Sequence, residues 1–262
     1  MNLIPIYQVD AFATHTFEGN PAAVCIMEDQ YADHILQSIA AENNLAETAF
    51  IWNVASHFSI RWFTPTKEVD LCGHATLASA HVLFKSNLVS SDTVRFDSKS
   101  GPLSVTREND GRLILDFPKD EFNHIECPNE IIKAINSAIS HCVKGKSDYL
   151  VQIDSEDALK NIKPDFSLIK KLNARGLIVT APGHEVDFVS RCFYPQYGID
   201  EDPVTGSAHT TLTPYWAERL NKTDFIAKQI SSRGGTLYCS LKNDRVLIGG
   251  YAQLYLEGKI YI

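Results

Sequence analysis

Residues 61–80 read RWFTPTKEVDLCGHATLASA, and residues 191–212 read RCFYPQYGIDEDPVTGSAHTTL. Both stretches begin with Arg-x-Phe-x-Pro and end on a glycine that is followed by a predicted helix. Arg61 corresponds to Arg191, and the second copy then carries three extra residues, so that Gly73 corresponds to Gly206. The two copies are separated by about half of the 262-residue chain. This spacing indicates an internal duplication with two similar domains.

The pattern of each half predicts many strands and one enclosed helix. The sequence ATLASAHVLF after Gly73 is apolar on nearly every face, which is typical of a helix buried all round. Alternating or short apolar runs predict strands at 4–12, 22–27, 48–53, 58–63, 93–96, 103–106, 113–117, 177–180, 187–193, 225–230, 236–240, 245–248 and 251–256. We therefore predict an α+β protein with two similar domains, each a curled, barrel-like, mostly antiparallel sheet around a central helix.

The domains are predicted at residues 1–118 and 119–262, with C-terminal strands that can cross over to the first domain. A duplicated fold implies a pseudo-twofold axis, and a cleft on that axis would be lined by the corresponding segments of both halves. Residues 34–43 have helical spacing, and another helix is expected after Gly206.

Composition excludes several classes of function. The formal net charge is −8, and Lys and Arg are scattered, so no nucleic-acid partner is expected. No apolar run is long enough for a membrane span, and the N-terminus lacks the features of a signal peptide, so we expect a cytoplasmic protein without a membrane partner. Six cysteines without a CxxC pair indicate reduced thiols, and the histidines lack zinc-ligand spacing, so no metal is expected.

The repeated glycines indicate an anion-binding device. The first turn of a helix has unpaired N–H groups and a partial positive charge. Gly73 and Gly206 each stand at the start of a predicted helix, where glycine allows close approach of a ligand. Two such helix starts would hold a carboxylate, or an enolate that forms beside it.

Four segments resemble the PhzF (phenazine biosynthesis-like) family: VDAFATHTFEGNPAAVCIM, AETAF at 46–50, LCGHAT and EDPVTGSAH. The resemblance covers nearly the whole chain in the right order. It implies the duplicated fold of diaminopimelate epimerase, with the site between the two domains. It also implies cofactor-independent isomerase chemistry on a small carboxylate substrate, often in a homodimer. Many members of the family have no known substrate.

The resemblance also implies roles for individual residues. Glu47 matches the general acid/base, and His74 and Asp202 match the polar residues that face it. Gly73, Gly206 and Ser207 match the anion-holding helix starts, and Asn20 of the GNPAAV motif is a further candidate for substrate binding. The residues around Glu47 agree with its role, because a polar ENN segment precedes it and an apolar AFIW segment follows, where an acid is partly withdrawn from water.

Three alternatives remain open. A two-base epimerase or racemase would use one thiol on each face of the substrate; Cys72 could be the first thiol, but Thr205 stands at the second position and is too weak an acid. A hydrolase could be built from Asp202, Ser207 and His209, but Ser207 and His209 are only two residues apart. A non-catalytic small-molecule-binding relative would not need Glu47. We favour one-base isomerisation by Glu47.

Overall fold

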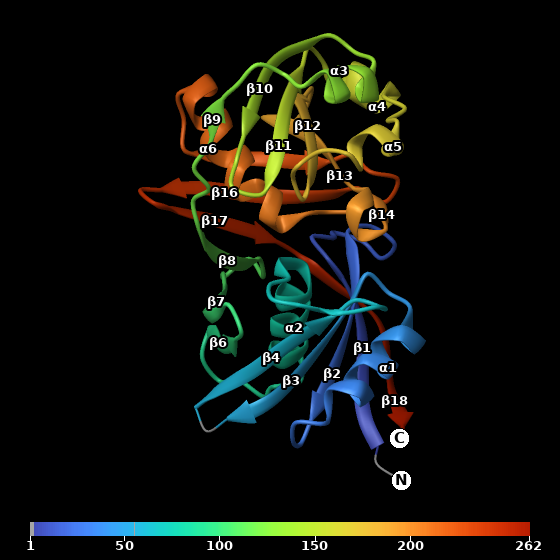
Figure 1. The fold of residues 1–262 in the computed structure, drawn as a ribbon. Helices are drawn as coiled ribbons and strands as arrows, with labels where there is room; N and C mark the ends of the chain where they lie inside the picture. Colours follow the sequence, from blue (N-terminus) through green and yellow to red (C-terminus); the bar gives the residue numbers. More distant parts are fainter. Residues whose placement is uncertain (1–2, 55) are drawn as a thin grey trace. The chain divides into compact units, whose positions relative to one another are not determined.

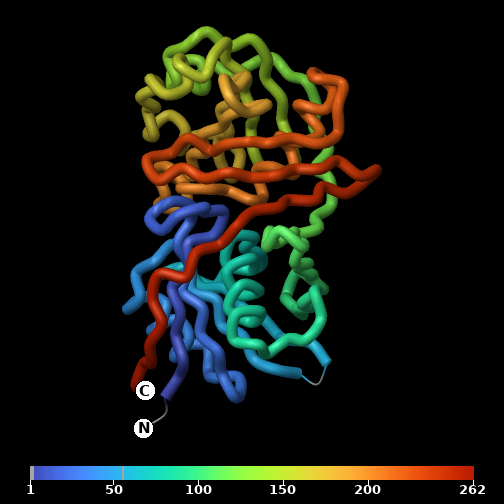
Figure 2. Tube along the Cα trace, turned by 180° about the vertical axis from the view of Figure 1, so that it is seen from behind, coloured from blue at the N-terminus to red at the C-terminus, as the bar shows by residue number. Residues whose placement is uncertain are grey.

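The computed structural model describes residues 3–54 and 56–262. It divides into two compact units, Met1–Asp116 with Gly249–Ile262, and Phe117–Ile248. The last strand, β18 (Ala252–Tyr261), pairs antiparallel with β1 (Leu3–Ala11) along its length (Figure 2). Residues 249–262 therefore lie in the first unit, because the backbone hydrogen bonds of β18 go to the N-terminal strand; the predicted boundary at 118/119 allows C-terminal strands to cross over in this way.

The first unit is a mixed sheet with two helices. Its remaining elements are β2 (Asn20–Met27), α1 (Asp33–Asn43), β3 (Glu47–Val54), β4 (His57–Phe63), β5 (Glu68–Val69), α2 (Gly73–Lys85), β6 (Thr93–Ser98), β7 (Gly101–Arg107) and β8 (Leu113–Pro118). β2 is antiparallel to β1, and α1 crosses over to β3, which is parallel to β2. β4 and β5 follow antiparallel, and after α2 the chain returns as β6, parallel to β4.

After an additional short strand and helix, and with two short helices in place of α1, the second unit repeats this order of elements. They are β9 (Asn123–His124), α3 (Asn129–Ile135), β10 (Ile139–Lys144), β11 (Asp148–Ile153), α4 (Glu156–Asn161), α5 (Phe166–Ile169), β12 (Gly176–Pro182), β13 (Phe188–Tyr194), η1 (Pro195–Tyr197), β14 (Ile199–Asp202), η2 (Gly206–Ala208), α6 (His209–Leu220), β15 (Asp224–Gln229), β16 (Gly235–Lys242) and β17 (Arg245–Gly250). β10 and β11 are antiparallel, β12 is parallel to β11, and β15 is parallel to β13. The predicted α+β fold with two similar domains is confirmed (Figure 1).

A buried helix forms the centre of each unit. α2 contacts β1, β2, β3, β7 and β18 of its own unit, and the strands surround it in Figure 1. The predicted all-round burial is confirmed, since only the two ends of α2 and His81 are more than slightly exposed. The helix after Gly206 differs from the expectation, because one 3₁₀ turn, η2, precedes α6.

Helix α6 tolerates Pro214 because its lost hydrogen bond is replaced. Proline has no N–H, so the carbonyl four residues earlier, at Thr210, loses its partner in the helix. The backbone N–H of Asp120 donates to that carbonyl at 3.2 Å. The Asp120 carboxylate also accepts from Thr211 Oγ1 at 2.7 Å and from the Lys146 backbone N–H at 3.2 Å. Asp120 thus ties the start of α6 to the β10–β11 turn.

The repeated Arg-x-Phe motif has the same structural role in both units. Arg61 donates from Nε and Nη2 to the carboxylate of Glu68, at 2.7 and 2.8 Å. Arg191 makes the same pair of bonds to Glu201, also at 2.7 and 2.8 Å. Each guanidinium also stacks on the phenylalanine two residues later, with distances of 5.1 and 5.2 Å to the ring centroids. The repeat therefore encodes a clamp between two strands.

The strand register corrects the position of the three extra residues. In the first unit Trp62 pairs with Val69, and in the second unit Cys192 pairs with Asp202. Val69 therefore corresponds to Asp202, not to Ile199. The extra residues lie before Asp202, in the turn between β13 and β14 that contains η1. This 3₁₀ turn takes the place of the tighter connection between β4 and β5 in the first unit.

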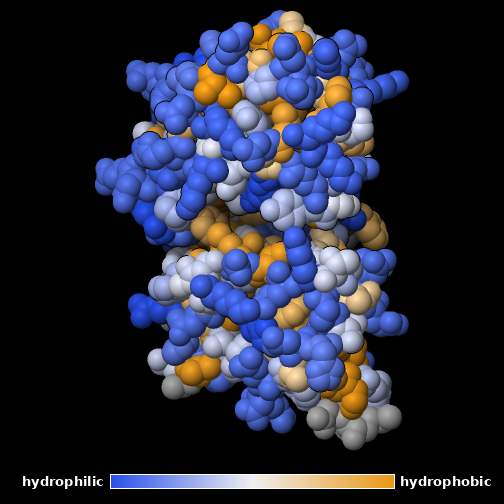
Figure 3. Space-filling model, in the orientation of Figure 1, coloured by the Kyte–Doolittle hydropathy of each residue, from blue (hydrophilic) through white to orange (hydrophobic). Residues whose placement is uncertain are grey.

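Hydrophilic residues cover most of the face shown in Figure 3. Within the described residues, no helix combines the length and the hydropathy needed to cross a membrane.

Candidate active site

Glu47 and His74 meet at the start of the central helix of the first unit. Glu47 is the first residue of β3, and His74 is the second residue of α2. His74 Nε2 lies 3.2 Å from Glu47 Oε2, and their side chains are only 8% and 14% exposed. Because both groups are largely withdrawn from water, their interaction is stronger than that of a surface pair. The two residues predicted to carry the chemistry are brought together.

Cys72 completes this cluster on the other side of the imidazole ring. Its sulfur lies 3.5 Å from His74 Nδ1. Its carbonyl accepts the Thr76 hydroxyl at 2.6 Å and the Thr76 backbone N–H at 3.1 Å, which closes the first turn. The N-cap residue Cys72 makes no side-chain capping hydrogen bond that meets the usual geometry, so amides at the start of α2 can donate to another acceptor. Gly73, the predicted anion holder, is the first residue of this turn.

In this cluster the pKa values of both His74 and the Cys72 thiol are raised. Burial by itself lowers the pKa of His74, but the hydrogen-bonded Cys72 and the Glu47 carboxylate outweigh burial, and the pKa lies well above its usual range. Burial, followed by the charge of Glu47, raises the pKa of the Cys72 thiol. The imidazole therefore lies close to both the Glu47 carboxylate and the Cys72 sulfur.

Glu47, Cys72 and His74 also form a group that could ligate a metal ion. One ligand atom from each lies within 4.8 Å of the others. Zinc accepts this combination of carboxylate, thiolate and imidazole. A metal needs a deprotonated thiol and a neutral imidazole, whereas the pKa shifts of Cys72 and His74 favour the opposite forms. The set fits a proton-transfer site better than a metal site.

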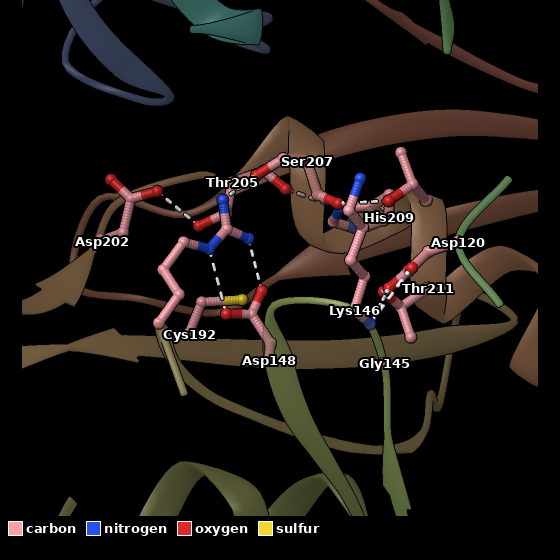
Figure 4. Close-up of polar contacts among 12 residues, drawn as sticks. Asp120, Gly145, Lys146, Asp148, Cys192, Asp202, Thr205, Ser207, His209 and Thr211 are labelled. Carbon is pink, nitrogen blue, oxygen red and sulfur yellow. Dashed lines mark hydrogen bonds and ion pairs between the residues drawn. The ribbon is translucent and has the colours of Figure 1, made fainter. Parts of the chain in front are cut away.

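In the second unit, Asp202 is held in place at the end of β14. It is buried, and it accepts a hydrogen bond from the Thr205 hydroxyl (Figure 4). The buried Gln229 side chain donates to the Asp202 carbonyl at 2.7 Å and accepts the Thr205 backbone N–H at 2.8 Å. Gly206 follows directly and begins η2. The loop that carries the predicted residues Asp202 and Gly206 is therefore fixed by its own side chains.

Ser207 contacts an arginine that the sequence analysis missed. Arg175 Nη1 donates to Ser207 Oγ at 3.0 Å. The same guanidinium donates from Nε to Asp148 Oδ1 at 3.0 Å and from Nη2 to Asp148 Oδ2. One signal could have identified Arg175: it stands directly before an apolar strand, GLIVTAP, much as Glu47 begins ETAFIW. An ionisable residue at or directly before a strand start is thus a signal in both halves.

His209 is a structural residue, which removes the hydrolase alternative. Its ring is fully buried and stacks on Phe188, with centroids 6.0 Å apart, and its Nδ1 lies 2.9 Å from the Thr205 carbonyl. Burial lowers its pKa to about 4, so the ring is neutral and Nδ1–H donates to that carbonyl. Ser207 is engaged by Arg175 and Asp202 by Thr205. A Ser-His-Asp relay is therefore not formed.

Asn20 lies at the same end of the first sheet as Glu47. It is the first residue of β2 and is completely buried. Ala22, two residues later, pairs with Glu47 in the parallel β2–β3 ladder. Gly19 precedes it with φ of +70°, and a Cβ there would clash with the Ala11 carbonyl. The glycine thus allows the chain to bring Asn20 to the strand end that carries Glu47.

Comparison with known proteins identifies relatives along the whole chain. The family described as phenazine biosynthesis-like protein matches residues 9–258. An uncharacterized isomerase of Halalkalibacterium halodurans is 45% identical over 266 aligned positions, covering 100% of both chains. The crystal structure of a PhzF-family phenazine biosynthesis protein from Enterococcus faecalis has a TM-score of 0.97 and 46% identity, again over 100% of both chains. A hydroxyproline epimerase from Agrobacterium vitis shares the fold alone, with a TM-score of 0.64 and 9% identity over 99% of this chain and 91% of the epimerase.

Proposed function

Since the chain belongs to the phenazine biosynthesis-like (PhzF) family, we propose that it is a cofactor-independent isomerase of a small carboxylate, with Glu47 as its general acid/base. Relatives named as isomerases support isomerase activity at the general level. The substrate and the one-base mechanism go beyond what those names state. The roles assigned to Asp202, Gly206, Ser207 and Asn20 are part of this proposal, and so is their action on the same substrate as Glu47.

The observation that carries the proposal is the contact between Glu47 and His74. A carboxylate 3.2 Å from an imidazole nitrogen, with both side chains largely buried, is an arrangement used for proton transfer. It lies beside the start of α2, where the backbone N–H groups of a first helical turn can bind a carboxylate or stabilise an enolate. A purely structural ion pair would not require an uncapped helix start next to it.

In the proposed reaction, Glu47 removes a proton from a carbon that conjugation with the carboxylate activates. The electrons of the broken C–H bond move into the conjugated system, and its double bond shifts. Glu47 then returns the proton to a second carbon on the same face, so that the product is an isomer of the substrate. The His74 imidazolium donates to Glu47 and stabilises it while it carries negative charge. The amides at the start of α2 stabilise the charge that develops on the substrate.

A two-base racemase is less well supported. The pKa of the Cys72 thiol is raised, which makes it a weaker source of thiolate than a free cysteine. Thr205 occupies the corresponding place in the second unit, and its hydroxyl donates to Asp202. Cys192 is fully buried, and burial raises the pKa of its thiol. No second thiol among the described residues stands at the repeated position.

The test is solvent exchange in D₂O. A panel of small unsaturated and cyclic carboxylates, with trans-4-hydroxy-L-proline included for the racemase alternative, is incubated with the protein and followed by NMR for deuterium uptake. Glu47→Gln should lower the exchange rate about a hundred- to ten-thousand-fold, because the amide cannot accept the proton. Glu42→Gln, on the exposed side of α1, is the matched control. Exchange that persists in Glu47→Gln would reject the assignment, and binding without exchange in the wild-type protein would favour a non-catalytic relative.

A further inference from the structure

The duplicated fold places two different ionisable residues next to corresponding strand starts, one position apart in register. In the β3–β4 ladder Phe63 pairs with Thr48, and in the β12–β13 ladder Phe193 pairs with Leu177. Glu47, the residue before Thr48, thus corresponds to the residue before Leu177, which is Gly176, and Arg175 comes one position earlier. The first unit carries an acid at this position, whereas the second carries a glycine there and a cation one residue earlier, directly before β12.

The partners of these two residues correspond as well. Glu47 contacts His74, which follows Gly73, and Arg175 contacts Ser207, which follows Gly206. In both units a strand start therefore reaches the second residue of the glycine motif at the start of the central helix. The same arrangement of strand and helix holds the proposed acid/base pair Glu47 and His74 in the first unit and the hydrogen-bond donors of Arg175 and Ser207 in the second.

Arg175 is held firmly and still has donors to spare. A guanidinium carries five N–H protons; two go to the Asp148 carboxylate and one to Ser207. The other two have no hydrogen-bond partner among residues 3–54 and 56–262. The Asp148 side chain is 3% exposed, whereas the Arg175 side chain is 33% exposed. The buried carboxylate thus anchors a guanidinium that is accessible to solvent.

Tyr194 fixes the plane of this guanidinium. The Arg175 Cζ lies 5.0 Å from the centroid of the Tyr194 ring. The ring can occupy this place because residue 176 is a glycine, where a Cβ would clash with the ring. Stacking on one face and hydrogen bonds to Asp148 on one edge leave the guanidinium little freedom to rotate. Donors held in this way bind an acceptor at a low entropic cost.

The arginine also sets the direction of the Ser207 hydroxyl. A serine oxygen that accepts from Arg175 Nη1 keeps its own O–H for another acceptor. Ser207 lies in η2, immediately before α6, where the helix dipole favours negative charge. The protons left over are two N–H of Arg175 and the O–H of Ser207, so the complement is an anion with two acceptor oxygens.

We propose that Arg175 is a substrate-binding residue that, with the Ser207 hydroxyl, takes the carboxylate of the substrate. This inference rests on the proposed function, which requires a carboxylate substrate. It adds Arg175 as the residue that recognises the carboxylate group. Because Asp148 offsets the charge of Arg175, binding depends on directed hydrogen bonds more than on net charge. The subsite therefore favours a monoanionic carboxylate over a dianion such as phosphate, which the Asp148 charge opposes.

The experiment uses cyclohex-1-ene-1-carboxylate as the probe and its neutral carboxamide as the comparison. The ¹⁵N-labelled full chain is titrated with each, and NMR follows the Arg175 Nε–H and the Ser207 backbone amide. Saturable shifts are expected with the carboxylate. The affinity for the carboxamide and for inorganic phosphate should be lower by a factor of about ten or more. Arg175→Lys keeps a charge for Asp148 but loses the planar fork, so the carboxylate affinity should also fall about tenfold. Arg95→Lys, on an exposed position of β6, should leave it unchanged.

Ser207→Ala provides a second variant, which leaves the Arg175–Asp148 pair intact. It should lower the affinity for the carboxylate and leave the affinity for the carboxamide unchanged. Wild-type-like carboxylate affinity in both Arg175→Lys and Ser207→Ala would overturn the proposal. So would equal affinity for carboxylate and carboxamide, or the absence of any shift at these two resonances. Glu47→Gln should bind the probe normally. The exchange experiment tests the role of Glu47, and the binding experiment tests the role of Arg175. Failure of one proposal is therefore distinguishable from failure of the other.

Discussion

His74 Nε2 lies 3.2 Å from Glu47 Oε2, while Nδ1 of the same ring lies 3.5 Å from the sulfur of Cys72. The imidazole thus stands between a carboxylate and a thiol, with little exposure to water. Since the charge of Glu47 favours the protonated ring, the three residues form an ordered chain of donors and acceptors. The protonation state of this chain determines when Glu47 can act as a base.

The first prediction concerns the pH dependence of folding. The pKa of His74 is raised in the folded protein, above its unfolded value of about 6.5. Its stabilising contribution is therefore fully present below pH of about 6.5 and is lost as the pH rises through the raised pKa. The stability of the His74→Gln variant should not show this decrease with rising pH, because the variant has no imidazole to titrate. Thermal unfolding of both proteins, measured from neutral to alkaline pH, should show curves that converge as the pH rises.

The same group should control the alkaline limb of the reaction rate. Exchange by the wild-type protein should fall as His74 loses its proton, and Glu47→Gln should lower the His74 pKa, because the carboxylate that raises it is removed. Imidazole ¹⁵N shifts measure this pKa directly. An unchanged His74 titration in Glu47→Gln would show that the contact does not couple the two groups.

The second prediction concerns Cys72. Cys72→Ala should keep substantial exchange activity, because the thiol stays protonated and only orients the imidazole. Cys72→Ser should resemble the wild type more closely, since its hydroxyl can accept from Nδ1. Initial exchange rates at several pH values provide the measurement. Complete loss in both variants would restore the two-thiol mechanism.

The third prediction concerns the clamp formed by Arg191 and Glu201. Glu201→Gln should cost about 1–3 kcal/mol in the free energy of unfolding, because a bidentate charged contact is lost. Arg191→Met should cost more, since Arg191 also donates to the carbonyls of Leu159 and Ile162. The double variant should cost less than the sum of both. Urea unfolding of the four proteins measures this coupling, and strict additivity would contradict it.

The fourth prediction concerns metal. Dialysis against EDTA should leave the exchange rate unchanged, because the protonated forms of Cys72 and His74 do not bind metal ions. Metal analysis before and after dialysis is the control. Activity that is lost with EDTA and regained with Zn²⁺ would assign the Glu47, Cys72 and His74 group to a metal instead.

Most of the fold could be predicted because its signals are local. The strands and the buried helix α2 are visible as alternation and as an apolar run. The strands β10 and β11 were not predicted. β10, ISHCVK, exposes Ser140 and His141 and buries only Cys142 and Val143, so it has no clear alternation. Its place is decided by pairing with β9 and β11.

The position of the three extra residues shows a limit of sequence comparison. Ile199-Asp200 resembles Val69-Asp70, and a gapless alignment prefers that match. The structure aligns Glu68 with Glu201 instead, because each carboxylate must reach the arginine of the neighbouring strand. Hydrogen-bond geometry acts between strands, and no local similarity score contains it.

By itself, the sequence of this protein determined the duplication, the α+β fold and the segments that carry Glu47, His74, Asp202 and Ser207. These follow from residue types and spacing, which act along the chain. Only the tertiary structure decided which side chains meet. It placed His74 between Glu47 and Cys72, and it brought Arg175 to Ser207 across 32 positions of sequence. The reason is physical: contacts and pKa shifts depend on distance and burial, and these arise only when the strands close around the central helix.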